Sequence, residues 1–491
     1  MKWANDPWVI FLYFITLLGI WTYLTNPFVS KRSLFKNPYK ANVEGDKIVV
    51  EKVYDVRIRR GWHHQLFAYI HCAWQIVYYR LKRPRKTVAT EVDEIIAEIL
   101  HERFNPRRPY LISGDHFVEH YPRNLGVFYY PAFDGSTAIS EEDWIHRQQI
   151  LLQSLYFFLA VFTKAKTLST TVVPMSRHSV SLVNIYAYPS DTLYSILYAL
   201  YALSTENVLS KLYPYRSSSS FELLTETAAN QALVEYREKL SKVVTHFINK
   251  VFDRETGLLK KDLLLSGTKD ITRRSQAFYD NVVFWRTLEL ANLLKISYDN
   301  ELDVHELKQR ILENFWDERE GIFREDLSDE ATENSYYSSD WLVVLFTGFL
   351  DPSKKSEREH YERIIRYVKK HEIDEPFPLK YHAENRGYRQ YHLVRMFLPE
   401  YGGSAIWSFW GMEYCKLLIL MHQATGEKWY LEDATKHFNS YTKNIEKFRG
   451  FPEVYDNTGN LLRKGFYSSI LRTGWVINYL QVKRMLEEVK K

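Results

Sequence analysis

The sequence predicts an all-α fold in which helices pack in two layers, and three observations support this prediction. Apolar residues recur at the i, i+3, i+4 and i+7 spacing of a helix, whereas strand-like alternation is almost absent after residue 90. Several segments are apolar around much of their circumference, so each needs neighbours on two sides, as in a double-layered helical ring. A repeated turn phrase indicates that one structural unit recurs along the chain.

The chain opens with an apolar stretch that has the length of a membrane span. WVIFLYFITLLGIWTYLTN covers residues 8–26, and no charged residue lies between Asp6 and Lys31. About 20 such residues cross a bilayer core. A cleaved signal peptide is the alternative, but the stretch has no small-x-small cleavage site. We therefore expect residues 1–30 to form a transmembrane anchor, and the lipid bilayer to be one partner.

A basic, membrane-proximal segment is expected over residues 31–90. Residues 26–90 hold fourteen Lys and Arg against four acidic residues, while the chain after residue 90 sums to about −5. Within this segment, GWHHQLFAYIHCAWQIVYYRLKRPRK (61–86) suits a helix lying among lipid headgroups, with a second span over 61–79 as the alternative. The basic residues after the first span favour a single-pass protein with a cytoplasmic body, which a second span would reverse. KIVVEKVYDVRI (47–58) shows strand alternation.

Residues 91–491 are expected to form one helical domain. Amphipathic or largely apolar helices are predicted over 141–165, 190–204, 275–295, 339–350 and 404–426. Several begin at Ser or Asp, the residue types that cap helix N-termini.

Three related phrases interrupt these helices. They are VFDRETGLLKKD (251–262), FWDEREGIFRED (315–326) and VYDNTGNLLRKG (454–465). In each, an aromatic residue and an Asp precede a Gly and an apolar residue. We interpret the phrase as a turn in which Asp caps the reversal and Gly adopts a positive φ.

Other chemistries lack their minimum parts in this sequence. There is no Gly-rich phosphate loop, no GxSxG elbow and no HExxH, and two cysteines cannot build a disulfide framework. His116 and His120 have a helical ligand spacing but no matched third ligand. The acidic body carries no basic stripe that would track phosphates. We expect no cofactor, no metal and no nucleic-acid partner.

The turns, the paired helices and a late Pro-Glu segment resemble the (α/α)6-toroid glycosidases, in particular the glucoamylase-like and glycogen-debranching amylo-α-1,6-glucosidase group. The resemblance covers roughly residues 110–485. It implies an (α/α)6 toroid that follows the anchor and basic segment, and a glycoside hydrolase acting on an oligosaccharide or glycan.

The resemblance also implies site residues. SGTKDITRRSQAFYD (266–280) is similar to the family segment that carries the general acid, which would be Asp270, and GFPEVYD (450–456) to the segment that carries the base, which would be Glu453. YLISGDHFVEHYPRNLGVFY (110–129) resembles the segment that binds the terminal sugar, although Asn124 stands where the family has a carboxylate. The expected sugar-binding residues are Arg123, Asn124, Tyr188, Arg274, Asp340, Trp407, Trp410 and Trp475.

Each candidate also has a structural interpretation. Glu453 could be a solvated turn carboxylate, Asp270 and the rival acid Asp340 could cap helices, and Arg123 could neutralise a buried acid. The tryptophans could belong to the core. The predicted function is a membrane-anchored, inverting hydrolase of an α-linked glucose-type oligosaccharide. The alternative is a tethered, non-catalytic carbohydrate-binding or scaffold toroid, and the basic aromatic helix suggests a lipid-linked glycan as a third possibility.

Overall fold

The structure is a computed structural model. It describes residues 16, 35–81 (for 73–81 the backbone alone), 85–104, 114, 120–184, 188–204, 221–261, 263–266, 272, 274–299, 302–329, 331, 336–384, 390, 396, 398–464 and 467–491. The expected anchor over 1–30 therefore lies outside the described residues apart from Thr16. In the described part of the chain, no helix is long and apolar enough to cross a membrane.

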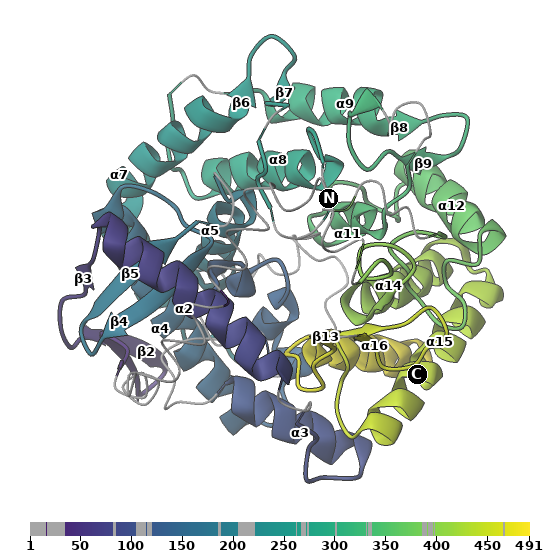
Figure 1. The fold of residues 1–491 in the computed structure, drawn as a ribbon, viewed down its shortest axis with the longest axis horizontal. Coiled ribbons are helices and arrows are strands. Elements are labelled where there is room, and N and C mark those ends of the chain that lie inside the picture. The colour runs from purple at the N-terminus through teal and green to yellow at the C-terminus, as the bar shows by residue number, and fades with distance from the viewer. Residues whose placement is uncertain are drawn as a thin grey trace.

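Within these residues, six helices form an outer ring (Figure 1). They are α3 (Val92–Arg103), α4 (Glu141–Ala165), α7 (Glu226–Val251), α9 (Val304–Phe315), α12 (Lys355–Lys370) and α15 (Lys428–Phe448).

Between consecutive outer helices the chain turns inward and forms a second ring. The inner elements are the 3-10 turns η2 (Pro122–Leu125), η3 (Tyr130–Phe133) and η4 (Gly135–Thr137), followed by α5 (Ser190–Ser204), α8 (Phe278–Leu293), η5 (Ser339–Leu342) with α11 (Val343–Phe346), α14 (Ser408–Thr425) and α16 (Val476–Val489). Each contacts the next, and α16 contacts η3 and η4, so the ring closes. The fold is an (α/α)6 toroid, as predicted, with 3-10 turns as its first inner element.

Burial explains the two kinds of helical pattern in the sequence. Every residue of inner helix α5 is buried, because other elements surround it on all sides. Outer helix α12 buries only Tyr361, Ile364, Ile365 and Val368, which form one stripe at helical spacing. The fully buried pattern of α5 thus belongs to the inner ring and the narrow stripe of α12 to the outer ring, whereas outer helix α4 is buried around much of its circumference.

The repeated phrases form the predicted turns. In the first two, the turn joins a short strand pair, β6 (Phe252–Asp253) with β7 (Leu258–Leu259) and β8 (Trp316–Asp317) with β9 (Ile322–Phe323). The Asp side chain accepts a hydrogen bond from the backbone N–H two residues on, at 3.0, 3.0 and 2.9 Å for Asp253, Asp317 and Asp456. The glycines that follow, Gly257, Gly321 and Gly459, have φ of 68°, 69° and 83°. Both predicted roles are confirmed.

The all-α expectation is wrong for one insertion. Between α4 and α5 the chain forms a hairpin of β4 (Thr171–Ser176) and β5 (Ser179–Val183), and β3 (Arg57–Ile58) pairs with β5. The valines and threonines of this insertion favour strands. The strand predicted over 47–58 is present as two strands, β2 (Lys47–Lys52) and β3. β2 pairs with β1 (Tyr39–Glu44), and β3 pairs with β5.

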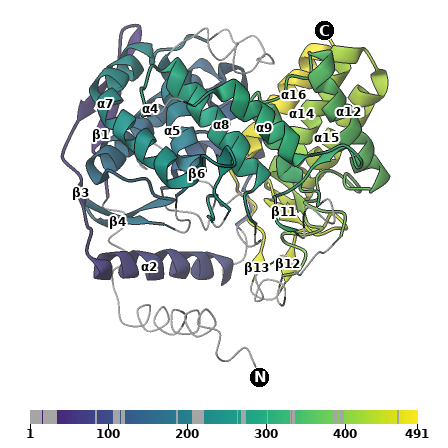
Figure 2. The same ribbon diagram turned by 90° about the horizontal axis from the view of Figure 1, so that it is seen from above.

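One end of the toroid carries the remaining short strands and a long crossing helix. β10 (Ile406–Trp407) pairs with β11 (Val454–Tyr455), and β12 (Arg463–Lys464) pairs with β13 (Tyr467–Ser468). Helix α2 (Trp62–Leu81) contacts β4 and β5 near one end and β13 near the other. Figure 2 shows α2 lying across this end of the ring.

Candidate functional site

Buried polar side chains gather where the inner helices begin. Strands β5, β10 and β13 precede α5, α14 and α16, so these three helices start at the end that α2 crosses (Figure 2). Helix N-termini carry partial positive charge and stabilise nearby carboxylates. The buried polar residues at or beside the inner-element N-termini are Arg123, Asn124, Ser190, Asp191, Asp280, Asn281, Ser339, Asp340, Ser408 and Thr473.

A buried ion pair between Arg274 and Asp340 joins two of these elements. Arg274 Nη1 lies 2.7 Å from Asp340 Oδ2, and the two side chains are 2% and 1% exposed. Burial alone would lower the pKa of Arg274, but Asp340, Asp280 and Glu325 outweigh it and raise that pKa. Asp340 therefore lies against a charged guanidinium, which favours a carboxylate as its partner.

Asp280, in the first turn of α8, is a carboxyl group with different properties. Ser190 Oγ donates a hydrogen bond of 3.0 Å to Asp280 Oδ1, which ties α5 to α8. Burial raises the pKa of Asp280, although Arg274 and hydrogen bonds from Ser266 and Ser190 oppose the shift. A carboxyl group of this kind keeps its proton to higher pH. Asp280 was not predicted from the sequence, because an acid in the first turn of a helix is a common structural feature.

A second buried pair, which was not predicted from the sequence, lies beside the first. His382 Nε2 is 3.7 Å from Glu325 Oε2, and both side chains are buried. Glu325 also lies in the electrostatic field of Arg274. No local sequence signal joins Glu325 to His382, since they follow different helices and meet through the fold.

The buried charged residues described so far follow the N-termini of the inner helices, and we call them the charged arc. Arg123 extends this arc to the first inner element, η2. Its Nη1 lies 4.0 Å from Asp191 Oδ2, at the start of α5. Its guanidinium carbon lies 5.2 Å from the centroid of the Phe128 ring, within cation–π range. Asn124 is buried beside it in η2. The structural interpretation of Arg123, neutralising a buried acid, thus has its acid in Asp191.

A row of aromatic rings, the aromatic arc, connects the two ends of the charged arc. We call the two arcs together the circuit. Ring centroids are separated by 5.4 Å for Phe128 and Trp475, 6.1 Å for Trp475 and Trp407, and 5.2 Å for Trp407 and Tyr381. The Tyr381 carbonyl accepts a hydrogen bond from the backbone N–H of Ser339, next to Asp340. The charged arc and the aromatic arc therefore join at both ends.

Glu453 lies in the aromatic half of this circuit. Its carbonyl accepts hydrogen bonds from the backbone N–H and Oγ of Ser408, each at 3.1 Å, and its N–H donates to Ile470 at 3.0 Å. The side chain is buried, so Glu453 is not a solvated turn carboxylate. Burial raises the pKa of the Tyr129 hydroxyl, and the nearby Glu453 carboxylate adds to the shift.

The remaining predicted site residues are placed differently. Trp410 is 1% exposed and packs against Phe409 and Phe346 in the interior of the ring. Tyr188 is half-buried just before α5 and packs against the core. Asp270 lies outside the described residues. The structure thus brings together Arg123, Asn124, Arg274, Asp340, Trp407, Trp475 and Glu453 at one end of the toroid.

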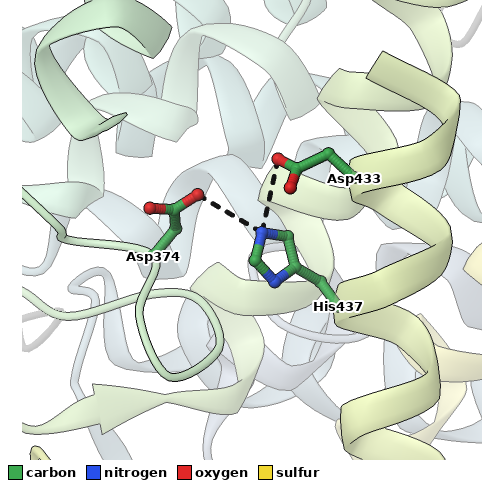
Figure 3. A group of neighbouring side chains, drawn as sticks. All are labelled: Asp374, Asp433 and His437. Carbon is green, nitrogen blue, oxygen red and sulfur yellow. Dashed lines mark hydrogen bonds and ion pairs between the residues drawn. The ribbon is translucent and has the colours of Figure 1, made fainter. Parts of the chain in front are cut away.

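A second cluster, of Asp374, Asp433 and His437, has the composition of a metal site (Figure 3). His437 Nε2 lies 3.3 Å from Asp374 Oδ2 and 3.4 Å from Asp433 Oδ2. However, the Lys369 ammonium forms ion pairs with the same two carboxylate oxygens. The position that a cation would take is therefore occupied by a side chain, and the cluster fits a salt-bridge network between α12 and α15.

No protein-family model matches the sequence, and no curated protein matches it. Similar solved structures include a rhamnosidase from Klebsiella oxytoca with rhamnose bound, at 12% identity and a TM-score of 0.48, covering 82% of this chain and 66% of the rhamnosidase. The likeness is one of fold.

Two further structures show the same degree of similarity. A GH63 mannosylglycerate hydrolase from Thermus thermophilus, in complex with glucose, has 12% identity and a TM-score of 0.45, covering 80% of this chain and 99% of the hydrolase. A cellobiose 2-epimerase from Spirochaeta thermophila has 10% identity and a TM-score of 0.42, covering 81% of this chain and 97% of the epimerase. The toroid assignment itself rests on the closed inner ring described above.

Proposed function

We propose that this chain is a carbohydrate-active enzyme, a glycoside hydrolase. Its active site would lie at the end of the toroid where the inner helices begin and which α2 crosses, and we call this end the inner-helix end. The observation that carries the proposal is the joined circuit of buried charged groups and aromatic rings that includes Arg274, Asp340, Trp407, Trp475 and Glu453. Sugars present hydroxyl groups to charged side chains and apolar ring faces to aromatic ones, so a circuit of this composition suits them.

Hydrolysis requires two carboxyl groups with separate roles. In the proposed mechanism Glu453 is the base that activates a water, and Asp270 is the acid that protonates the leaving oxygen. Among the described carboxyl groups of the circuit, Asp280 is the rival acid, because its pKa is raised. Arg123 would hold a sugar hydroxyl, and Trp407 and Trp475 would stack on sugar rings. We propose inversion on an α-linked glucose-type oligosaccharide.

A second candidate function rests on the His382–Glu325 pair. An imidazole held beside a carboxylate can remove a proton from the carbon next to a sugar carbonyl, which is the first step of aldose–ketose isomerisation or of epimerisation. The two side chains lie 3.7 Å apart in the same buried arc as Arg274. This reaction would use His382 and leave Glu453 without a chemical role.

The deciding experiment incubates the full chain with α-linked di- and oligosaccharides and with free aldoses, and follows the products by NMR. The variants are Glu453→Gln, Asp270→Asn, Asp280→Asn and His382→Gln, with Thr442→Val, on outer helix α15, as a control for handling. Hydrolysis that is lost in Glu453→Gln and in one of the two Asp variants supports the proposal, and the Asp variant that loses activity identifies the acid. The anomer formed first reports inversion.

Three outcomes would contradict the hydrolase. Hydrolysis that survives in Glu453→Gln would show that Glu453 is not the base. Isomerised or epimerised sugar that depends on His382 favours the second candidate. Saccharide binding without turnover of any substrate favours a carbohydrate-binding toroid.

A further inference from the structure

Helix α2 exposes a compact group of large apolar side chains on its first two turns. Trp62, Leu66, Phe67 and Tyr69 are 75%, 38%, 41% and 36% exposed. The other exposed large apolar side chains of the described residues are scattered over separate elements, as is usual for a soluble surface. Several on one helix form a surface that a partner would cover. Because Tyr69 also contacts the toroid, we refer to Trp62, Leu66 and Phe67 as the α2 face.

The opposite side of α2 attaches to the toroid by a narrow contact. Ala68 and Cys72 pack on Val173 and Val183 of the β4–β5 hairpin, and the Tyr69 hydroxyl donates a hydrogen bond to the Asn184 carbonyl. The far end of the helix contacts β13. Figure 2 shows α2 crossing the end of the ring, and the side chains of the α2 face are those that this attachment leaves exposed.

The charges around the α2 face indicate what it meets. No charged residue occurs in α2 from Trp62 to Tyr79. Exposed basic side chains flank the helix on both sides, at Arg57 and Arg59 before it and at Lys86 after it, whereas Arg85 pairs with Glu102 at 3.2 Å and Arg60 donates to the Lys164 carbonyl. The nearest acid before the helix, Asp55, is paired with Lys52 at 2.5 Å. Aromatic and aliphatic side chains bounded by Arg and Lys are the pattern of a helix lying in an anionic lipid interface.

We propose that the α2 face docks on the surface of an anionic lipid bilayer, so that the inner-helix end of the toroid faces the lipid. A lipid surface is favoured over a protein partner because the face is uncharged with a basic border. In addition, a charge-free apolar run of bilayer length, residues 7–30, precedes it in the same chain.

Docking through α2 has a consequence for the candidate site. The strands that α2 touches, β5 and β13, lead directly into α5 and α16, whose N-termini lie in the buried polar circuit. The circuit would then face the membrane. If the proposed hydrolase function holds, the substrate class that this orientation favours is a glycan attached to a membrane lipid.

The test uses the full chain with a fluorescent probe attached at Leu66→Cys. The native cysteines, Cys72 and Cys415, are buried, and unmodified chain treated with the same reagent controls for their labelling. The matched control carries the probe at Val234→Cys, an exposed position on outer helix α7. With mixed phosphatidylcholine–phosphatidylglycerol vesicles, we expect the probe at 66 to shift to shorter wavelength and to be quenched by doxyl-labelled lipid. The probe at 234 should not change.

A second measurement tests docking through α2 separately from any membrane binding by residues 1–34. A probe at Arg463→Cys, on β12, reports how close the inner-helix end lies to the lipid. We expect its lipid quenching to fall about tenfold in a chain that also carries Trp62→Gln, Leu66→Gln and Phe67→Gln. A chain with Val88→Gln, Val234→Gln and Leu293→Gln, three apolar residues that are each at least half exposed, should retain it.

Several results would overturn docking. The probe at 66 could remain solvent-like on vesicles, the probes at 66 and 234 could respond equally, or the probe at 66 could be shielded without lipid, as a protein partner or a second copy would do. Hydrolysis of a soluble oligosaccharide should not change in the Trp62–Leu66–Phe67 variant. Failure of docking is therefore distinguishable from failure of the proposed catalysis.

Discussion

Arg274 and Asp340 form an ion pair of 2.7 Å in which neither side chain has more than 2% of its surface exposed. They come from separate segments, one leading into α8 and the other within η5, so the pair connects two neighbouring inner elements. Removing one partner leaves the other buried without its counter-charge, which in proteins is more damaging than removing both.

We therefore expect Arg274→Met to lower the free energy of unfolding by about 3–5 kcal/mol, because Asp340 is left as an uncompensated buried charge. The double variant Arg274→Met with Asp340→Leu should recover a large part of that loss. Urea unfolding followed by circular dichroism measures both, and Lys242→Met, in the exposed Lys242–Glu238 pair, is the control. Equal stability of Arg274→Met and wild type would contradict a buried charged pair.

The stability of the protein should fall with rising pH through the titration of His437. Burial alone would lower the pKa of His437, but Asp374 and Asp433 outweigh it and raise that pKa. A raised folded-state pKa means that the charged imidazole stabilises the fold fully below its unfolded value of about 6.5, and that this contribution is lost as pH rises through the folded value. We expect His437→Gln to remove this step from the melting temperature measured against pH.

The same network should lose stability at acid pH through a different group. Burial alone would raise the pKa of Asp433, but His437 and Lys369 lower it to about 2. Its contribution is therefore present above the unfolded value of about 3.9 and is lost as pH falls toward 2. In Asp433→Asn, the melting temperature should therefore fall less steeply as the pH is lowered into the acid range, which is the acid limb of the pH profile. An unchanged acid limb would show that the carboxylate is not paired.

Metal should not stabilise this cluster, because the Lys369 ammonium already lies between the two carboxylates. We expect the melting temperature to be unchanged by EDTA and by added Zn²⁺. Lys369→Met removes the internal cation, and in that variant added Zn²⁺ should raise the melting temperature. A large effect of EDTA on the wild-type protein would contradict the salt-bridge interpretation.

The turn glycines should be sensitive to substitution. Gly321 has a φ of 69°, and a Cβ there would lie 2.9 Å from Arg363 Nε. We expect Gly321→Ala to destabilise the protein by about 1–2 kcal/mol, the usual energy of the left-handed conformation for a residue with a side chain. Gly321→Asn should lose less, because Asn tolerates this conformation. Thermal unfolding of the two variants, compared with Gly411→Ala inside helix α14, separates backbone strain from packing.

Part of this architecture could be read from local patterns alone. The helical stripes depend on spacing within one segment, and the Asp-to-backbone hydrogen bonds and positive φ of the turns depend on a few consecutive residues, as at Asp317 and Gly321. The β4–β5 insertion was missed because it lies in a largely helical context, although its strands are about as long as β2. The transmembrane prediction concerns residues outside those described.

The candidate site likewise contains residues that were predicted from the sequence and residues that were not. Arg123, Arg274, Trp407, Trp475 and Glu453 were predicted through segments that resemble a known family, and the fold gathers them at one end. Asp280 and the Glu325–His382 pair were not predicted, since a helix-first-turn acid and two residues on different loops carry no local signal.

The sequence by itself therefore determined the helices, the turns and the charge-free and basic segments, because each arises from neighbouring residues. Only the tertiary structure decided which N-termini meet, which carboxylate is paired with Arg274, which buried carboxyl has a raised pKa, and that α2 lies across the end that holds the candidate site. Those properties depend on burial and on distances between residues far apart in the chain, and no local pattern encodes them.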